Sequence, residues 1–462
     1  MSGLPLRGRA ARAARQQPVD FGAFVRAAGE GGRLVVQPRM GFGDPALMRE
    51  GLIAAKGADA VTVGTLTLDS YTRVGELDAV EEALRQGISL NGYPVVNHPP
   101  ATTEGVLAGV RDAAFPVQVR HGSATPIDIF WALLRLNLNA TEGGPVSYCL
   151  PYGRTPLADG IKNWEACCEL YTRLRDVGIE PHLETFGGCM MGQLCPPSQL
   201  VAISFLEAMF FAQHGITSLS LSYAQQTDMG QDREAVGALR RLCAELLPTD
   251  NWHVVIYAYM GVYPETYRGA HQLLGRAAEL AVSTGAHRLI VKTVAESRRI
   301  PTIAENVLAL EYADAVARAT RPPSAGAGGE ADSPTYAEAR ALVDAVLGLD
   351  DDIGRALLAA FRRGWLDVPY CVHPDNAGRA RSYIGPDGRL HWADLGRLPL
   401  RGVAEPGPRK RIGSAELLAD LFHIRRSYDE QALDAGSGPG GRRPVPASPR
   451  DRDRRTVKRS LT

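Results

Sequence analysis

Short apolar runs alternate with longer amphipathic stretches along most of this 462-residue chain. Between residues 33 and 321, runs rich in Val, Ile or Leu are followed by a turn and then by apolar residues at helical spacing, as at 161–177, 199–214 and 267–284. Strands that alternate with helices over this length predict a parallel α/β fold. The candidate strands are 34–39, 60–65, 94–98, 116–120, 146–152, 181–186, 218–223, 254–259 and 288–292.

The length of the alternating region favours an eight-fold β/α (TIM-type) barrel, although nine candidate strands are one too many. A doubly wound open sheet is the alternative. Helical patterns at 336–365 and 414–433 enclose a hairpin-like run within 367–400, which predicts a C-terminal α+β extension. We expect a basic, partly disordered arm at 1–30, a barrel at 31–323, a linker with the extension at 324–434, and a disordered basic tail at 435–462.

Charge is distributed unevenly along the chain. The 51 basic and 51 acidic residues cancel overall, but residues 17–434 carry a net charge of −10, which argues against nucleic-acid binding. No run approaches the roughly 18 apolar residues of a membrane span, and no apolar core of a secretory signal follows the basic N-terminus. Seven cysteines without a CxxC spacing indicate neither a disulfide framework nor a zinc site, so we expect a cytoplasmic protein.

Arginine recurs at the ends of candidate strands, where β/α barrels carry their active sites. Arg39 ends the first run, Arg73 follows the second and Arg120 ends the fourth. Three guanidinium groups at one barrel mouth would bind carboxylates, because their planar forks donate two parallel hydrogen bonds. Three unrelated surface arginines are the competing interpretation, and position alone leaves both open.

Lysine is rare, and Lys292 ends the most apolar run, with Glu296 in the loop that follows. A lysine in this place is a Schiff-base nucleophile, a cation for a ligand, or a strand-end side chain that reaches solvent.

Glu142 precedes two glycines, and Tyr148 and Tyr152 lie close behind them. A carboxylate with two phenols could hold an ammonium group by charge and hydrogen bonds. A capping Glu with two packing Tyr residues is the alternative.

Other chemical motifs are missing from the sequence. It has no dinucleotide-binding fingerprint, Walker sequence, HExxH or GxSxG. His98, His121 and His253 lie near candidate strands without the spacing of metal ligands, so we expect no metal site.

Several stretches together resemble the large catalytic subunit family of glutamate mutase, also called the methylaspartate mutase epsilon chain. The resemblance runs from about residue 34 to about residue 400, and several motifs in the same order are specific where one would mean little. The stretches are QPRMG at 37–41, DSYTR at 69–73, LNGYPVVNH at 90–98, QVRHG at 118–122, TEGGPVSYCLPY at 141–152, LIVKTVAESRRIPT at 289–302, and DVPY with NAG within 367–378.

The resemblance implies an adenosylcobalamin-dependent mutase that interconverts L-glutamate and threo-3-methyl-L-aspartate by radical fragmentation and recombination. The cobalamin-binding signature DxHxxG is absent from this chain. The family carries that signature on a separate small subunit. The resemblance therefore implies a small cobalamin-binding partner, with this chain as a homodimer within a heterotetramer.

The resemblance also implies roles for individual residues. Arg39, Arg73 and Arg120 match the arginines that clamp the substrate carboxylates, with His121 beside them. Glu142, the one residue assigned as catalytic, matches the partner of the substrate ammonium, and Tyr148 and Tyr152 match residues that hydrogen-bond to substrate. The positions that match cofactor contacts are Gly41, Asn91, Pro151, Tyr263, Lys292, Glu296 and Ile300, of which Lys292 and Glu296 would hold the adenosyl ribose.

Some positions depart from the family pattern. The loops at 187–195 and 222–232 are unlike it, Tyr263 stands where Phe is usual, and Arg288 stands where Lys is usual. A related amino dicarboxylate is thus a possible substrate. Two other functions stay open: a Schiff-base lyase that uses Lys292, and a non-catalytic barrel that only scaffolds a cobalamin-binding partner.

Overall fold

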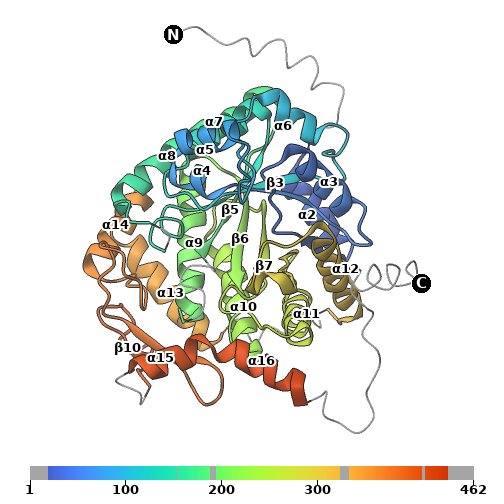
Figure 1. Cartoon of the computed structure of the whole chain (residues 1–462). Helices are drawn as coiled ribbons and strands as arrows, with labels where there is room; N and C mark the ends of the chain where they lie inside the picture. Colours follow the sequence, from blue (N-terminus) through green and yellow to red (C-terminus); the bar gives the residue numbers. More distant parts are fainter. Residues whose placement is uncertain (1–18, 152, 188–193, 323–331, 408–411, 435–462) are drawn as a thin grey trace, which may run out of the picture.

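In the computed structural model, which describes residues 19–151, 153–187, 194–322, 332–407 and 412–434, eight parallel strands form one sheet (Figure 1). The order of neighbours is β1-β8-β7-β6-β5-β4-β3-β2. One bridge between Val36 and Thr62 joins β1 to the residues before β2 and closes the sheet, which confirms the TIM-type barrel. The strands are β1 (Val35–Gln37), β2 (Gly64–Thr67), β3 (Val117–Arg120), β4 (Ala140–Gly143), β5 (His182–Thr185), β6 (Ser218–Ala224), β7 (Trp252–Tyr257) and β8 (Arg288–Ile290).

Helices surround the barrel. Several begin at an Asp or Thr whose side chain accepts a hydrogen bond from the first turn; Asp44 and Thr266 are examples. These elements are α2 (Phe21–Glu30), α3 (Pro45–Lys56), α4 (Ser70–Val74), α5 (Leu77–Arg85), α6 (Pro100–Leu107), α7 (Ile127–Leu136), α8 (Leu157–Thr172), η1 (Arg173–Val177), α9 (Pro197–Gln213), α10 (Met229–Leu246), α11 (Tyr267–Ser283), η3 (Val294–Ser297) and α12 (Ile303–Ala319).

Two of the nine strand predictions are wrong. Residues 94–98 form a turn that begins at Pro94, whose carbonyl accepts from His98 N at 3.1 Å. Residues 146–151 also turn, because Leu150 N donates to Val146 O at 3.0 Å. The strand of this unit is β4, which lies a few residues earlier and contains Glu142 itself.

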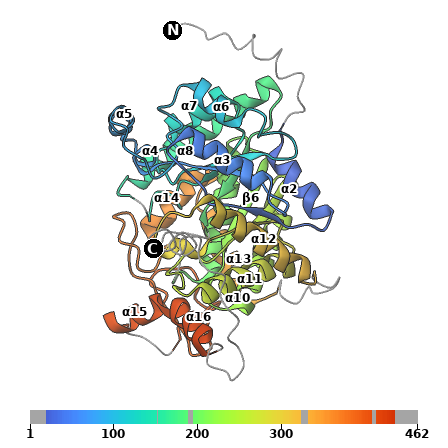
Figure 2. The same cartoon turned by 45° about the vertical axis from the view of Figure 1, so that its right-hand side comes forward.

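The C-terminal residues form the expected α+β extension on one side of the barrel. Helix α13 (Pro334–Leu347) packs against α9 and α10, and α14 (Ile353–Arg363) packs against α8 and α9. Strands β9 (Arg381–Ile384) and β10 (Leu390–Asp394) form an antiparallel hairpin. Helices α15 (Ser414–Leu421) and α16 (His423–Asp434) lie together at the lower edge in Figures 1 and 2, where α16 packs on α11.

The barrel interior has an apolar floor and a polar layer above it. The floor consists of Phe21 from α2 with Val35, Val63 and Ala140, all at 0% exposure at or near the amino ends of the strands. Above the floor, side chains from five strands are completely buried and hydrogen-bonded to one another. They are Gln37, Gln118, Glu184, Ser220 and Arg288.

The described helices include none that is long and apolar enough to cross a membrane. Six cysteines fall in the described ranges, and all six are buried free thiols.

Candidate active site

A buried ion pair lies at the carboxyl ends of two adjacent strands. Arg120 ends β3, Glu142 lies in β4, and the distance from Arg120 Nη2 to Glu142 Oε2 is 2.7 Å. Both side chains are almost completely buried. Burial would lower the pKa of Arg120, but the charge of Glu142 outweighs it and raises that pKa. The guanidinium of Arg120 is therefore charged in a water-poor environment, with the carboxylate as its partner.

Two tyrosines donate hydrogen bonds to the same carboxylate. The Tyr148 hydroxyl donates to Glu142 Oε1, and the Tyr257 hydroxyl donates to Glu142 Oε2 at 3.0 Å. With Arg120 these are three donors for a group that has about four lone-pair positions, so one position stays available for another donor. Tyr148 thus lies where the sequence predicted it, whereas Tyr152 lies outside the described residues.

The turn that carries Tyr148 is fixed by a buried carboxyl group on α9. Glu207 accepts hydrogen bonds from Val146 N at 3.0 Å, Ser147 N at 2.8 Å and Ser147 Oγ at 2.9 Å. Its pKa is raised to about 7 because burial outweighs these hydrogen bonds. A side chain on Gly144 would collide with this carboxyl group, so glycine is required for the close approach.

Arg120 still has donor capacity that no described residue uses. Its Nη1 is buried without a hydrogen-bond partner in the described part of the chain. The guanidinium carbon lies 4.9 Å from the Tyr257 ring centroid and 5.9 Å from that of Phe186. A buried, unpaired guanidinium nitrogen is costly, and an anionic ligand would satisfy it.

His121, next to Arg120, has a similar unused donor. Its Nδ1 accepts from Ser123 N at 3.1 Å, while Nε2 is buried and has no partner among the described residues. Burial, together with the charges of Arg73 and Arg120, lowers the pKa of His121 to about 3. The ring is therefore neutral, and we infer from the Ser123 contact that Nε2 bears the hydrogen.

A second carboxylate below Glu142 was not predicted as part of the site. Glu184 in β5 accepts a hydrogen bond from Arg288, and the Tyr257 hydroxyl lies within hydrogen-bond distance of both Glu184 and Glu142, so the two buried carboxylates share its single hydrogen. Burial would raise the pKa of Glu184, but the charges of Arg288 and Arg120 outweigh it and lower that pKa. The two carboxylates and two guanidinium groups balance each other in charge.

The other two predicted arginines lie in different surroundings. Arg73 Nε donates to Leu68 O at 2.9 Å, and its charge acts on His121, so it is close to the Arg120 side of the site. Arg39 Nη1 forms an ion pair with Glu296 at 2.8 Å. Arg39 thus lies with the residues predicted to bind a cofactor.

Lys292 has two contacts that suit a cation. Its Nζ lies 5.0 Å from the Tyr263 ring centroid and 3.9 Å from Glu296 Oε2. Both contacts favour the charged form, whereas a Schiff-base lysine has to lose its proton before it can attack a carbonyl. This environment argues against the lyase alternative.

The remaining predicted cofactor positions have mixed environments. Gly41 packs so closely on Thr67 that a side chain would collide with the backbone. Asn91 Oδ1 accepts from Ser70 N at 2.9 Å, Pro151 is partly buried, and Ile300 is 55% exposed. An exposed Ile is consistent with a contact to a ligand, but these contacts alone do not identify one.

The family profile and the similar proteins agree on one family. The profile of the family described as "Methylaspartate mutase E chain (MutE)" matches residues 17–415. The glutamate mutase epsilon subunit of Halobacterium salinarum is 32% identical over 398 residues, which cover 84% of this chain and 81% of that protein. The subunit of the same name from Escherichia coli O157:H7 is 28% identical, with 82% and 81% covered, and that from Haloarcula marismortui is 30% identical, with 78% and 74% covered. This chain, a β/α barrel with a buried Arg–Glu–Tyr site at its mouth, belongs to the methylaspartate mutase E chain family.

Proposed function

We propose that this chain is the catalytic subunit of an adenosylcobalamin-dependent mutase that interconverts L-glutamate and threo-3-methyl-L-aspartate. Membership of the family supports an isomerase of the mutase type, and the relatives are named glutamate mutase epsilon subunits. The observation that carries the proposal is the buried Nη1 of Arg120, which has no partner among the described residues although its neighbouring nitrogen is paired with Glu142.

The Arg120–Glu142 pair is complementary to an amino acid. An α-amino acid carries a carboxylate and an ammonium group on one carbon, and the pair presents a cation and an anion side by side. The substrate carboxylate would accept hydrogen bonds from Arg120 Nη1 and His121 Nε2. The ammonium would donate to the lone-pair position of Glu142 that Arg120, Tyr148 and Tyr257 leave unused.

The proposed substrates have a second carboxylate, for which this chain has further arginines. Arg73 lies near His121, and Arg39 lies with Glu296 and Lys292. We assign Arg73 and Arg39 to the distal carboxylate. Tyr152 lies outside the described residues, and its role as a substrate contact stays a prediction.

The residues around Lys292 fit an adenosyl group. The Glu296 carboxylate can accept from ribose hydroxyls, and Lys292 beside it can donate to ribose oxygens. Bound adenosylcobalamin would supply the radical that removes a hydrogen atom from the substrate. The protein residues then hold the charged groups of the substrate in place and exclude water.

The corrin requires another chain, because DxHxxG is absent from this sequence. We propose that a small cobalamin-binding subunit covers the barrel mouth, and that two copies of each chain form a heterotetramer. The scaffold alternative is disfavoured, because a scaffold has no need of a charged Arg–Glu pair desolvated at its mouth.

Reconstitution tests this proposal. The purified chain should convert L-glutamate only when both adenosylcobalamin and a small cobalamin-binding subunit are added. Steady turnover by the single chain would refute the two-subunit proposal. Borohydride trapping with L-glutamate, followed by peptide mapping, tests the lyase alternative, which predicts a substrate adduct on Lys292.

Conservative replacement of the arginines tests their roles. Arg73→Lys or Arg120→Lys keeps the charge but loses the guanidinium fork, and we expect a loss of roughly 2–4 kcal/mol in transition-state stabilisation. Arg175→Lys is the control, because Arg175 forms a half-exposed pair with Glu180 outside the barrel mouth. Near wild-type rates in both mouth variants would remove these arginines from the substrate site.

A further inference from the structure

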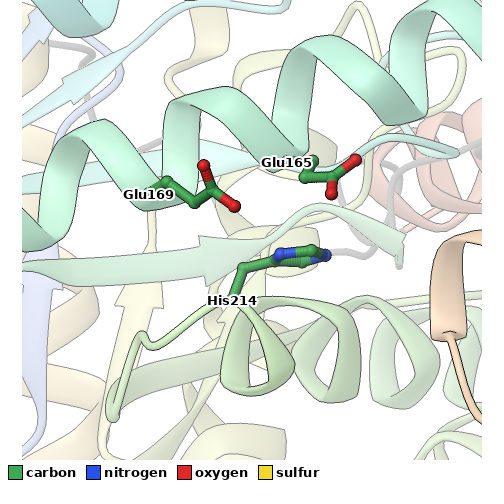
Figure 3. Close-up of side chains that lie close together, drawn as sticks. All are labelled: Glu165, Glu169 and His214. Carbon is green, nitrogen blue, oxygen red and sulfur yellow. The ribbon is translucent and has the colours of Figure 1, made fainter.

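Three potential metal ligands converge on the outside of the barrel, where the carboxyl end of α9 faces α8 (Figure 3). Glu165 and Glu169 are four residues apart on α8, and His214 is the C-cap of α9. One ligand atom from each residue lies within 4.8 Å of the others. Figure 3 shows the imidazole between the two helices, facing both carboxylates.

The two carboxylates lack a compensating charge in the described part of the chain. Like charges at i and i+4 destabilise a helix, and no described residue forms a hydrogen bond or an ion pair with either side chain. Lys162 and Arg173 flank them on the same helical stretch, but neither forms an ion pair with them. A bound cation would relieve the repulsion between the Glu165 and Glu169 carboxylates.

His214 brings a donor of a different chemical kind from a separate helix. Its ring packs against Phe210, with 4.6 Å between centroids, which restricts where the imidazole can point. It also lies at the carboxyl end of α9, where the free carbonyl groups give a partial negative charge that favours cations. The preceding residue is Gln213, whose Nε2 donates to Asp351 O at 2.8 Å and whose Oε1 accepts from Ile353 N at 2.8 Å. This helix end therefore also anchors the start of α14.

We propose that Glu165, Glu169 and His214 bind one divalent transition-metal ion of the zinc class. One imidazole nitrogen and two carboxylate oxygens suit such an ion, and water would complete the coordination. Because His214 ends α9 just before β6, the site lies toward the amino ends of the strands, at the end of the barrel opposite the Arg120–Glu142 pair. The ion would join α8 to the helix end that holds the C-terminal extension, and its role would be stabilisation.

The proposal is independent of the proposed mutase activity. Motif spacing reveals only ligands that lie close together in sequence, and His214 lies far from the two glutamates, so the sequence carries no signal for this site.

Metal binding to the full chain provides the test. Zn²⁺ should bind with a stoichiometry of one ion per chain in titration calorimetry and should raise the Tm by about 3 °C when it is near saturation. Co²⁺ as the probe should give a visible absorption band that Zn²⁺ displaces. The variant His214→Ala and the double variant Glu165→Gln with Glu169→Gln should lose both signals. The variant His271→Ala, at another partly buried histidine, on α11, should keep them.

The metal-free Tm separates a metal site from ordinary ion pairing. If the two carboxylates only repel each other without metal, Glu169→Gln should leave the metal-free Tm unchanged or raise it slightly. A lower metal-free Tm would mean that Glu169 pairs with Arg173 and would overturn the proposal. Absence of Zn²⁺ binding, or binding that persists in the His214→Ala variant, would overturn it as well.

Discussion

Replacement of Glu142 by Gln should reduce both the activity and the stability of this protein. The substitution keeps the size of the side chain and one oxygen acceptor but removes the charge that faces Arg120 at 2.7 Å. The amide nitrogen also brings hydrogens to a place where Tyr148, Tyr257 and Arg120 all donate. The variant therefore leaves a buried guanidinium without its anion and at least one hydrogen bond unmade.

The structure sets the size of the effect. At 2.7 Å and an effective dielectric constant of about 20, the gross attraction between the two charges is about 6 kcal/mol, of which desolvation cancels a large part. Removal of one partner from such a buried pair costs about 3–5 kcal/mol of stability. The loss of the ammonium partner should lower kcat by about 100-fold or more.

An exposed pair of the same geometry is the control. Arg175 and Glu180 are also 2.7 Å apart but half-exposed, and Glu180→Gln should cost at most about 1 kcal/mol. The double variant Arg120→Met with Glu142→Leu should recover most of the stability lost by Glu142→Gln, because apolar side chains can replace a buried pair. The double variant should remain inactive.

Urea unfolding and turnover, measured on the same purified variants, test the two roles of Glu142 separately. Turnover is measured with adenosylcobalamin and the small subunit present. If Glu142→Gln unfolds at the wild-type urea concentration, the pair does not contribute to stability as reasoned here. If the variant is destabilised but turns over at the wild-type rate, Glu142 does not bind the substrate.

Three further predictions concern the surroundings of this pair. Gly144→Ala should destabilise the protein by about 1–3 kcal/mol in urea unfolding, because the new methyl group meets the Glu207 carboxyl, while Gly105→Ala, with open space around it, should not. Glu207→Gln should lower kcat about 10-fold, with a smaller change in KM, because it displaces the turn that carries Tyr148. An unchanged kcat would show that this turn keeps its conformation without Glu207. Burial lowers the pKa values of His121 and His182 to about 3, so both residues stabilise the protein above pH 6.5 and lose that contribution as the pH falls. From pH 8 to pH 5 the free energy of unfolding should fall by about 2 kcal/mol for each histidine. A free energy of unfolding that stays constant over this range would contradict the prediction.

The sequence was sufficient for the repeating architecture. Arg120 was singled out because it ends a strand, and Tyr148 because it lies close behind Glu142 in one motif, and the structure brings both side chains to Glu142. Strand β4 was missed, because Ala-Thr-Glu-Gly is no apolar run. Its buried Glu142 is stabilised by Arg120 and Tyr257 from other strands and by Tyr148 from the turn that follows. Tertiary contacts thus override local propensity at the one strand that matters most for the chemistry.

The polar layer could not be predicted from single strands. Glu184 and Arg288 look like unpaired charges within apolar runs, and only closure of the barrel brings them into contact across its interior. The alternation of Ser and Leu in residues 218–222 was the available signal, since inward-facing serines indicate a hydrogen-bonded interior. Tyr257, which joins the two carboxylates, carried no signal of its own in the sequence.

The apolar floor has a consequence for kinetics. Because the fully buried Phe21, Val35, Val63 and Ala140 fill the barrel at the amino ends of the strands, the proposed site would be reached from their carboxyl ends. Substrate, product and the adenosyl group would all pass through this end of the barrel, which the small subunit would cover. Such a geometry implies an ordered sequence, in which the amino acid arrives before the complex closes and the product leaves only after it opens. Turnover would then be limited by the opening of the complex, and solvent viscosity should slow it more than isotopic substitution of the substrate does.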